Sequence, residues 1–287
     1  MLHSVYGPGH FGLSFELFPP KSAAGEAALH KNLAELMAFS PSYVTCTYGA
    51  GGSTRDKTLE IVENVHQTFG CPVASHLTCV GSTVDELRAY LAEAWRRGIE
   101  NIVALRGDPP KGETIFQQTA GGLRYAVDLV KLISSEFPQF GIAVAGYPET
   151  HQEAVSADAD LDNLKRKVDA GGHAIITQLF YDNQDFFRFR DRCERAGIRA
   201  PLVPGILPVT NLAQIRRIAS LCKARLPDEF IAALSKHEAD EDGQFEVGVD
   251  YATRQSQELV DAGAPGLHFY VLNKSQATGR VLRAVTI

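Results

Sequence analysis

A cation, a glycine and a carboxylate stand together where an apolar segment of the chain ends. The segment NIVAL, residues 101–105, is followed by Arg106, Gly107 and Asp108 and then by two prolines. Glycine allows a ligand to approach the backbone closely, and proline prevents a strand from continuing. We interpret this stretch as a short buried strand that ends in a ligand site. A simple ion pair at a turn is the alternative.

Glu16 is the second chemical candidate, because it lies in the apolar stretch SFELF, residues 14–18. An ionised carboxylate in such surroundings is costly unless it is paired or protonated. One interpretation is a structural salt bridge. The other is a carboxylic acid whose pKa is raised by its apolar surroundings, as a general acid at neutral pH requires.

Both candidates belong to a pattern that recurs along the chain, in which an apolar segment ends in a polar group and a turn. Eight such segments occupy residues 13–18, 42–48, 73–78, 101–105, 142–147, 173–180, 202–207 and 266–272. Helical patterns separate them, and strict alternation of strands and helices predicts parallel strands. Eight strands predict an α/β fold of the (β/α)8 TIM barrel type. We therefore expect a single catalytic barrel domain over residues 1–287, with an extra helix late in the chain.

The expected helices differ in how clearly their ends are marked. Thr83 and Glu86 form a capping box, and Ser53 or Thr54 is a suitable cap for the second helix. Helices are expected over residues 26–39, from 53 or 54 to 69, and over 83–97, 119–137, 157–170, 183–196, 211–222, 227–234 and 245–262, with a charged loop at 238–243.

A doubly wound open sheet is the alternative fold. Such a sheet normally carries a glycine-rich nucleotide loop after its first strand. Gly7, Gly9 and Gly12 match G-x-G-x-x-G, but they precede the first predicted strand. We interpret this match as chance, which favours the barrel.

In a closed barrel the strand ends gather on one face, where enzymes of this fold place their chemistry. The polar groups in or just after the C-terminal halves of the strands are Glu16, Thr47, Tyr48, His76, Thr78, Arg106, Asp108, Tyr147, Glu149, Thr177, Gln178, His268 and Tyr270. This set is poor in metal ligands, so we expect no metal site. The predicted strands contain no lysine, which argues against a Schiff-base aldolase, and the lack of paired histidines argues against a metal-dependent hydrolase.

Composition narrows the class of protein. The chain has 287 residues and a net charge of −6, which gives no reason to expect nucleic acid as a partner. No apolar run approaches the ~20 residues that cross a bilayer, and the N-terminus does not resemble a signal peptide. Five scattered cysteines without a C-x-x-C pair argue against disulfides and thiolate zinc sites. We expect a cytoplasmic protein that does not bind membranes.

Nine short motifs follow one another from residue 14 to residue 273. They are SFELFPP (14–20), VTCTYGA (44–50), HLTC (76–79), ALRGD (104–108), YPE (147–149), LKRKVDAG (164–171), TQ (177–178), PGILP (204–208) and HFYVLN (268–273). Together they resemble the bacterial methylenetetrahydrofolate reductases, and the resemblance covers nearly the whole chain. One motif alone is weak, whereas nine in the order of the family are specific.

The resemblance implies a barrel that binds FAD, takes hydride from NADH or NADPH, and converts 5,10-methylenetetrahydrofolate to 5-methyltetrahydrofolate. The positions that match flavin contacts of the family are Thr47, His76, Arg106, Gly107, Asp108, Ala145, Tyr147, Asp160, Asn163 and Lys167. The positions that match folate contacts are Glu16, Asp108, Gln178, Gln214, Ile218 and Lys274. A homo-oligomer is implied by the family alone.

The same resemblance implies a ping-pong cycle through flavin N5, with Glu16 as the general acid that protonates folate N10. Asp108 would bond the pterin, and its charge would favour the cationic iminium intermediate. Two residues differ from the family, because arginine is common at Lys274 and an aromatic residue or leucine at Ile218. A pterin-binding methyltransferase without flavin is the alternative function, and a non-catalytic flavin or folate binder is the third.

Overall fold

Parallel strands form one continuous sheet in the computed structural model, which describes residues 2–7, 9–48, 55–109 and 116–287. Their order in the sheet is β7-β6-β5-β4-β3-β2-β1-β9-β8. The strands are β1 (Gly12–Leu17), β2 (Tyr43–Cys46), β3 (Val73–Thr78), β4 (Asn101–Leu105), β5 (Gly141–Gly146), β6 (Ala174–Thr177), β7 (Leu202–Val203), β8 (Gly205–Ile206) and β9 (Gly266–Tyr270).

The first and last strands of this order are two halves of one predicted strand. Pro204 separates β7 from β8, and proline has no N–H with which to continue the ladder. β7 pairs with β6, and β8 pairs with β9. The sheet therefore closes on itself. This closure confirms the predicted (β/α)8 barrel and excludes the open doubly wound sheet.

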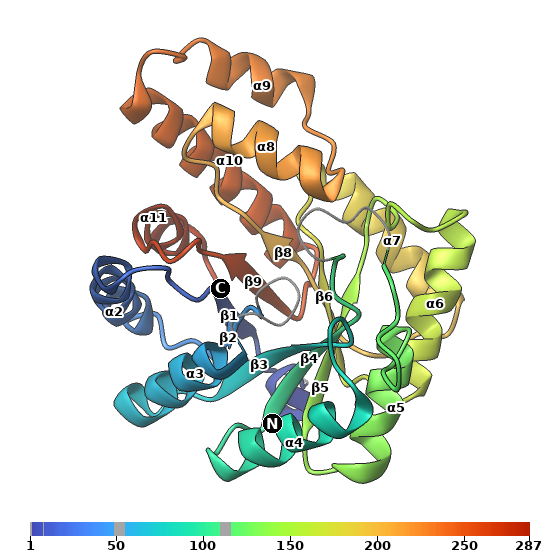
Figure 1. Cartoon of the computed structure of the whole chain (residues 1–287). Coiled ribbons are helices and arrows are strands. Elements are labelled where there is room, and N and C mark those ends of the chain that lie inside the picture. Colours follow the sequence, from blue (N-terminus) through green and yellow to red (C-terminus); the bar gives the residue numbers. More distant parts are fainter. Residues whose placement is uncertain (1, 8, 49–54, 110–115) are drawn as a thin grey trace.

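Helices alternate with the strands around the barrel (Figure 1). They are α1 (Leu2–Val5), α2 (Ala23–Met37), α3 (Arg55–Phe69), α4 (Val84–Arg96), α5 (Ala126–Glu136), α6 (Ala157–Asp169), α7 (Asn183–Arg195), α8 (Leu212–Cys222), α9 (Asp228–Ser235), α10 (Glu241–Asp261) and α11 (Gln276–Ala284). Thr83 and Glu86 form the predicted capping box of α4. Ser53 and Thr54, the proposed caps of α3, lie outside the described residues.

Two helix boundaries were predicted wrongly. The helix expected from Thr119 begins at Ala126. Gly121 has a φ of 71°, and a Cβ on Gly122 would lie 2.3 Å from the Ser82 carbonyl oxygen. This turn against a neighbouring loop delays the helix. Residues 238–243 are only partly a loop, because Asp240 caps α10, which begins at the next residue.

No residue range was predicted for two of the helices, α1 and α11. α1 lies at the amino ends of the strands, where the Leu2 N–H donates to Asn101 Oδ1 over 2.9 Å. Near it, the hydroxyls of Tyr6 and Tyr43 are 2.6 Å apart. α1 therefore closes the end of the barrel opposite the carboxyl ends of the strands.

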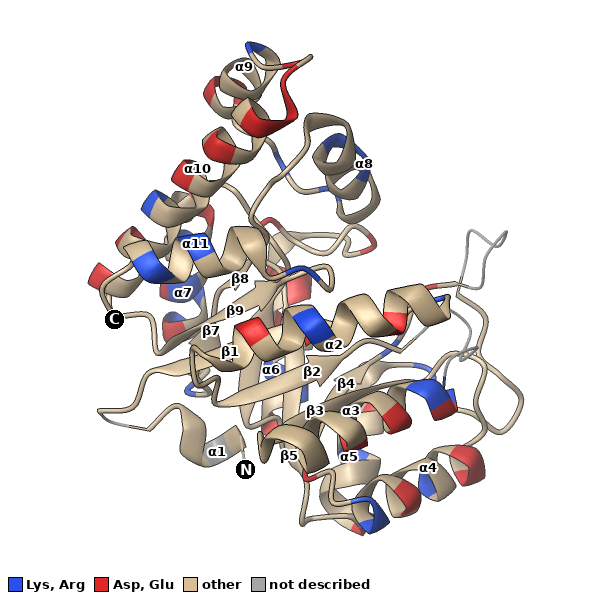
Figure 2. Cartoon of the chain, turned by 90° about the vertical axis from the view of Figure 1, so that its left-hand side faces the viewer, with Lys and Arg blue, Asp and Glu red and all other residues tan. Residues whose placement is uncertain are grey.

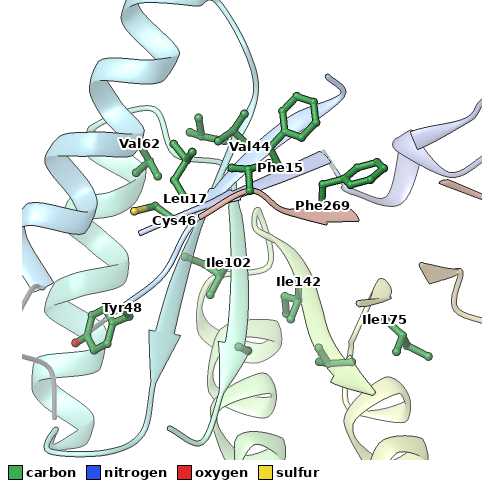
Figure 3. Packing of buried hydrophobic residues seen from close by; sticks show 14 of the residues in the cluster. Phe15, Leu17, Val44, Cys46, Tyr48, Val62, Ile102, Ile142, Ile175 and Phe269 are labelled. Carbon is green, nitrogen blue, oxygen red and sulfur yellow. The ribbon is translucent and has the colours of Figure 1, made fainter. Parts of the chain in front are cut away.

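Strand side chains alternate between two hydrophobic layers, as the pleat of a strand requires. Outward residues such as Val44, Ile102 and Ile142 belong to a layer that also includes residues of the surrounding helices (Figure 3). Inward residues, among them Val103 and Ala143, pack with Leu2 and Tyr6. Charged residues lie mainly on helices, as Figure 2 shows for α2, α4 and α10.

Three helices stand between β8 and β9 where a regular barrel unit has one, as expected from residues 211–222, 227–234 and 245–262. α8, α9 and α10 stand together at the top of Figure 1. A separate hydrophobic cluster joins Ile215 of α8 and Phe230 of α9 to Tyr181 and Leu207, which follow β6 and β8. This cluster holds α8 beside the carboxyl ends of the strands.

Candidate functional site

A central cavity of about 400 Å³ opens at the carboxyl ends of the strands. Nine of the site residues expected from the sequence line it, namely Glu16, Thr47, His76, Arg106, Gly107, Asp108, Ala145, Tyr147 and Gln178. They come from six successive strands, from β1 to β6, or from the residues just after them. The barrel closure alone brings these residues together, because they are spread over more than half of the chain.

An outer cavity of about 370 Å³ adjoins the central one. Arg106, Ala145 and Tyr147 line both. Asp160, Asn163 and Lys167 of α6 line the outer cavity alone. These α6 residues were assigned by resemblance only, and the structure brings them to the same site as the strand-end residues.

A third cavity, of about 180 Å³, lies between α8 and the segment after β9. Gln214 and Lys274 line it, and Tyr270 lines both this cavity and the central one. Ile218 lines none of the three cavities and packs at the edge of the α8 cluster. The structure therefore groups every predicted site residue except Ile218 around three cavities that have lining residues in common.

The carboxylate of Glu16 lies between two histidines. Its Oε2 is 3.3 Å from His76 Nε2 and 3.6 Å from His268 Nε2. Burial raises the pKa of Glu16, but the two imidazoles outweigh this effect and lower the pKa to about 2. The predicted raised pKa is wrong, because β3 and β9 bring imidazoles to a carboxyl whose own stretch of sequence is apolar. The salt-bridge interpretation describes this geometry.

One buried polar atom of the site has no hydrogen-bond partner among the described residues. His268 is held by a 2.8 Å hydrogen bond between its Nδ1 and the Ser14 hydroxyl, and its Nε2, like that of His76, faces the Glu16 carboxylate. The Oγ1 of Thr78, by contrast, is buried and forms no hydrogen bond with any described residue. Thr78 lines the central cavity. Buried polar groups are normally paired, so this hydroxyl points to a polar ligand.

Gly107 lets the wall of the cavity turn sharply. Its φ is 87°, and a Cβ there would lie 2.6 Å from Val80 Cγ1. Only glycine adopts this conformation without strain. The backbone between Arg106 and Asp108 can therefore follow the cavity wall, as the sequence indicated.

Arg106 is held by a bidentate ion pair at the junction of the two cavities. Its Nη1 and Nη2 donate to the two carboxylate oxygens of Glu153 over 2.6 and 2.7 Å. The Glu153 hydrogen bonds raise the pKa of Arg106. Glu153 lies in the loop after β5 and was not among the expected site residues.

Lys167 is a cation held in a poorly solvated place. Its Nζ donates to the Ala145 carbonyl oxygen over 2.5 Å and lies 5.9 Å from the ring centre of Tyr147. Burial lowers the pKa of Lys167 to about 8, although nearby Asp160 opposes this. Lys167 can therefore gain or lose its proton near neutral pH.

Sequence reasoning missed the further polar and aromatic residues of the outer cavity, which are Tyr125, His151, Glu153 and Arg166. His151 packs edge-on against Tyr147 with ring centres 4.7 Å apart. A usable signal existed for His151 and Glu153, because loops after barrel strands form the functional face. Tyr125 offered no such signal, since the sequence placed it inside a helix that begins one residue later.

Across the described ranges, no three or more His, Cys, Asp and Glu side chains are arranged to hold a metal ion. A search of the same residues finds no helix that is long and apolar enough to span a membrane. The site therefore consists of hydrogen-bonding groups, two imidazoles and several cations around three neighbouring cavities.

Comparison with known proteins assigns the family. Residues 2–286 match the family model described as methylenetetrahydrofolate reductase. The chain is 41% identical over 268 residues to the 5,10-methylenetetrahydrofolate reductase of Escherichia coli (strain K12), covering 93% of this chain and 88% of that one. It is 38% identical over 291 residues to methylenetetrahydrofolate reductase (NADH) 1 of Arabidopsis thaliana, covering 98% of this chain. The chain spans 49% of the length of that plant relative.

A solved structure shares the fold. It is described as a Clostridium thermocellum protein that binds two copies of 5-methyl-5,6,7,8-tetrahydrofolic acid, and its TM-score is 0.64 at 13% identity. The match covers 99% of this chain and 98% of that one. Because the family model covers nearly the whole chain, this protein belongs to the methylenetetrahydrofolate reductase family.

Proposed function

We propose that the protein reduces 5,10-methylenetetrahydrofolate to 5-methyltetrahydrofolate with FAD as cofactor and NADH or NADPH as hydride donor. One observation carries the proposal: the residues at the flavin and folate positions of the family, with the exception of Ile218, line three cavities that have lining residues in common. We also propose that residues 1–287 act as one catalytic domain, in a cytoplasmic homo-oligomer.

The side chains present fit FAD. The unpaired Thr78 Oγ1 offers a polar partner to a ring system in the central cavity. Arg106, Arg166 and Lys167 line the outer cavity, and cations of this kind suit a diphosphate. When bound, FAD would supply the chemistry of accepting and passing on hydride.

Folate reduction also needs a proton on the departing nitrogen N10, and Glu16 is the residue we propose to deliver it. With a pKa of about 2, the Glu16 carboxylate is ionised at neutral pH. The carboxylate would therefore have to receive a proton before it delivers one. The nearest neighbouring group is His76, whose Nε2 lies 3.3 Å from Glu16 Oε2. Loss of the N10 bond then leaves a cationic methylene iminium on the substrate.

Asp108 and Gln178 would orient and stabilise that substrate. Both line the central cavity. The negative charge of Asp108 favours a cationic intermediate beside it. The Gln178 amide offers both a donor and an acceptor to a pterin edge, and its Oε1 already accepts the Leu179 N–H over 2.9 Å.

The third cavity suits the tail of the folate. Lys274 is exposed at its rim, where an ammonium group can meet a glutamate carboxylate, and Gln214 lies opposite on α8. Lysine lacks the bidentate fork of the arginine common in the family. Ile218 does not line the cavity, so we assign it a packing role in α8 in the free protein.

Removing the Glu153 charge is expected to strengthen FAD binding. The Glu153 side chain is 48% exposed, and exposed ion pairs contribute up to about 1 kcal/mol. Glu153→Gln frees the Arg106 guanidinium and removes a negative charge near the proposed diphosphate. We expect the Kd for FAD, measured by quenching of flavin fluorescence, to fall about threefold. Glu136→Gln, which breaks the exposed ion pair with Arg88, is the matched control and should leave the Kd unchanged. Weaker binding by Glu153→Gln would contradict this account.

FAD affinity is expected to fall as pH rises through the pKa of Lys167. The free protein releases the Lys167 proton near pH 8, below the ordinary value of 10.5. A bound diphosphate would hold that proton, so binding at higher pH must take one up. We expect the Kd to rise about tenfold between about pH 7 and about pH 9. In Lys167→Met the dependence on pH should be flat. An equally steep dependence in that variant would exclude Lys167 as its source.

The direct test of the proposal is product formation. The purified full chain with FAD, NADH and methylenetetrahydrofolate should yield 5-methyltetrahydrofolate, which chromatography quantifies. The apoprotein without added FAD should yield none. A methyltransferase is the second candidate, because the fold neighbour is described as binding 5-methyl-5,6,7,8-tetrahydrofolic acid. Binding of 5-methyltetrahydrofolate without any uptake of FAD would favour that candidate.

A further inference from the structure

Two successive residues after β9 adopt a backbone conformation that is rare for their type. Leu272 has a φ of 49° and Asn273 a φ of 56°. Asparagine tolerates the left-handed region, but leucine seldom enters it. Strained residues persist only where their surroundings hold them, and they gather at functional sites. Other contacts must therefore stabilise the Leu272-Asn273 turn, and the turn is expected to have a functional role.

The Asn273 side chain stabilises the turn through two hydrogen bonds to the Phe18 backbone. Its Oδ1 accepts the Phe18 N–H over 3.0 Å, and its Nδ2 donates to the Phe18 carbonyl oxygen over 2.8 Å. The last paired residues of β1 and β9 are Glu16 and Tyr270. Asn273 thus continues the contact between the two strands beyond their ends, through a side chain instead of the backbone.

The other end of the turn is fixed to α2. The Ser275 N–H donates to Asn32 Oδ1 over 3.0 Å, and the Lys274 N–H donates to the Val271 carbonyl oxygen over 2.9 Å. Phe18 and Asn32 therefore hold the turn from two sides.

The turn presents two residues to the third cavity. Leu272 and Lys274 both line it, together with Gln214 and Tyr270. The left-handed residues reverse the chain just after β9, so the side chains of Leu272 and Lys274, on either side of Asn273, reach one cavity. If Asn273 released Phe18, the strain at Leu272 would favour an extended backbone and move both side chains away.

We propose that Asn273 is a positioning residue for folate. Its two hydrogen bonds to the Phe18 backbone hold Leu272 and Lys274 against the substrate tail. The inference depends on the proposed function, because it assigns folate to the third cavity. Asn273 does not line the central or outer cavity. Its loss should therefore affect the folate step and spare flavin reduction by the nicotinamide.

Three substitutions separate the effect of the Asn273 hydrogen bonds to Phe18 from the effect of the left-handed backbone. Asn273→Ala loses the hydrogen bonds and disfavours the left-handed backbone, whereas Asn273→Gly loses the hydrogen bonds but permits that backbone. Asn273→Asp keeps the acceptor for the Phe18 N–H and tolerates the conformation. We expect KM for methylenetetrahydrofolate to rise about tenfold in the Ala and Gly variants, with a smaller rise for Asp. The rate of flavin reduction by NADH should stay within twofold of wild type in all three. A Gly variant with wild-type KM would overturn the proposal.

Hydrogen exchange tests the Asn273 hydrogen bonds to Phe18 without any cofactor. The Phe18 amide proton is donated to Asn273 Oδ1, so a peptide containing Phe18 should exchange faster in Asn273→Gly than in wild type. Faster exchange with no turnover in any form of the protein would refute the proposed function alone. Unchanged exchange would refute the role of these hydrogen bonds, whatever the protein catalyses.

Discussion

Glu16→Gln is expected to abolish folate reduction while leaving flavin reduction by the nicotinamide intact. Positioned proton transfer contributes roughly 10²- to 10⁴-fold to a rate, so we expect at least about a 10²-fold loss in the folate step. The amide keeps the size of the side chain but cannot take up and pass on a proton, as the carboxylate 3.3 Å from His76 Nε2 would. Stopped-flow absorbance measures the two half-reactions separately.

Glu149→Gln is the matched control for the Glu16 substitution. Glu149 is also a partly buried carboxylate after a barrel strand, but it accepts the Arg225 N–H over 2.8 Å and lines none of the three cavities. Its amide can still accept that hydrogen bond. Both half-reactions should stay within a few-fold of wild type. A normal folate step in Glu16→Gln would show that Glu16 is not the acid.

Gly248→Ala is expected to destabilise the protein more than an ordinary surface change. A Cβ on Gly248 would lie 1.7 Å from the Val209 carbonyl oxygen, and this is backbone that cannot rotate away. Forcing α10 away from the segment before α8 should cost about 2–4 kcal/mol, after allowing for the better helix propensity of alanine. Urea unfolding should show the loss as a lower midpoint.

Gly279→Ala is the control, with the opposite expected sign. Gly279 is also helical, but the nearest atom to its Cβ would be 3.5 Å away, at the flexible end of Arg283. The substitution should therefore stabilise α11 by up to about 1 kcal/mol. If Gly248→Ala proved as stable as wild type, the close approach of α10 to Val209 would be wrong.

The barrel was predictable because its signal is local and repeated. Each strand is a short apolar segment with its own breaker, such as 101–105 before Arg106-Gly107, and each local pattern agrees with the closed sheet. The seventh strand is the one whose continuity the local pattern did not predict correctly. Pro204 lies inside a well-marked apolar segment, and its missing N–H divides that strand in two.

The pKa of Glu16 was not predictable from its neighbours in sequence. The stretch SFELF is apolar, but parallel pairing places His268 opposite Ser14, and β3 brings His76 to the carboxylate. Which distant side chains face a buried charge depends on register and closure. The same limit applies to Gly248. Glycine is required there because α10 contacts the Val209 backbone, and not because a helix ends at this position.

The measurement that tests the account most directly is the visible absorption spectrum of the full chain during one anaerobic cycle. After reconstitution with FAD, the protein should show flavin absorbance that bleaches on addition of NADH or NADPH. The absorbance should return when methylenetetrahydrofolate is added, as expected if both substrates react at one cofactor. A colourless protein that failed to take up FAD would contradict the reductase assignment. So would a reduced flavin that methylenetetrahydrofolate could not reoxidise.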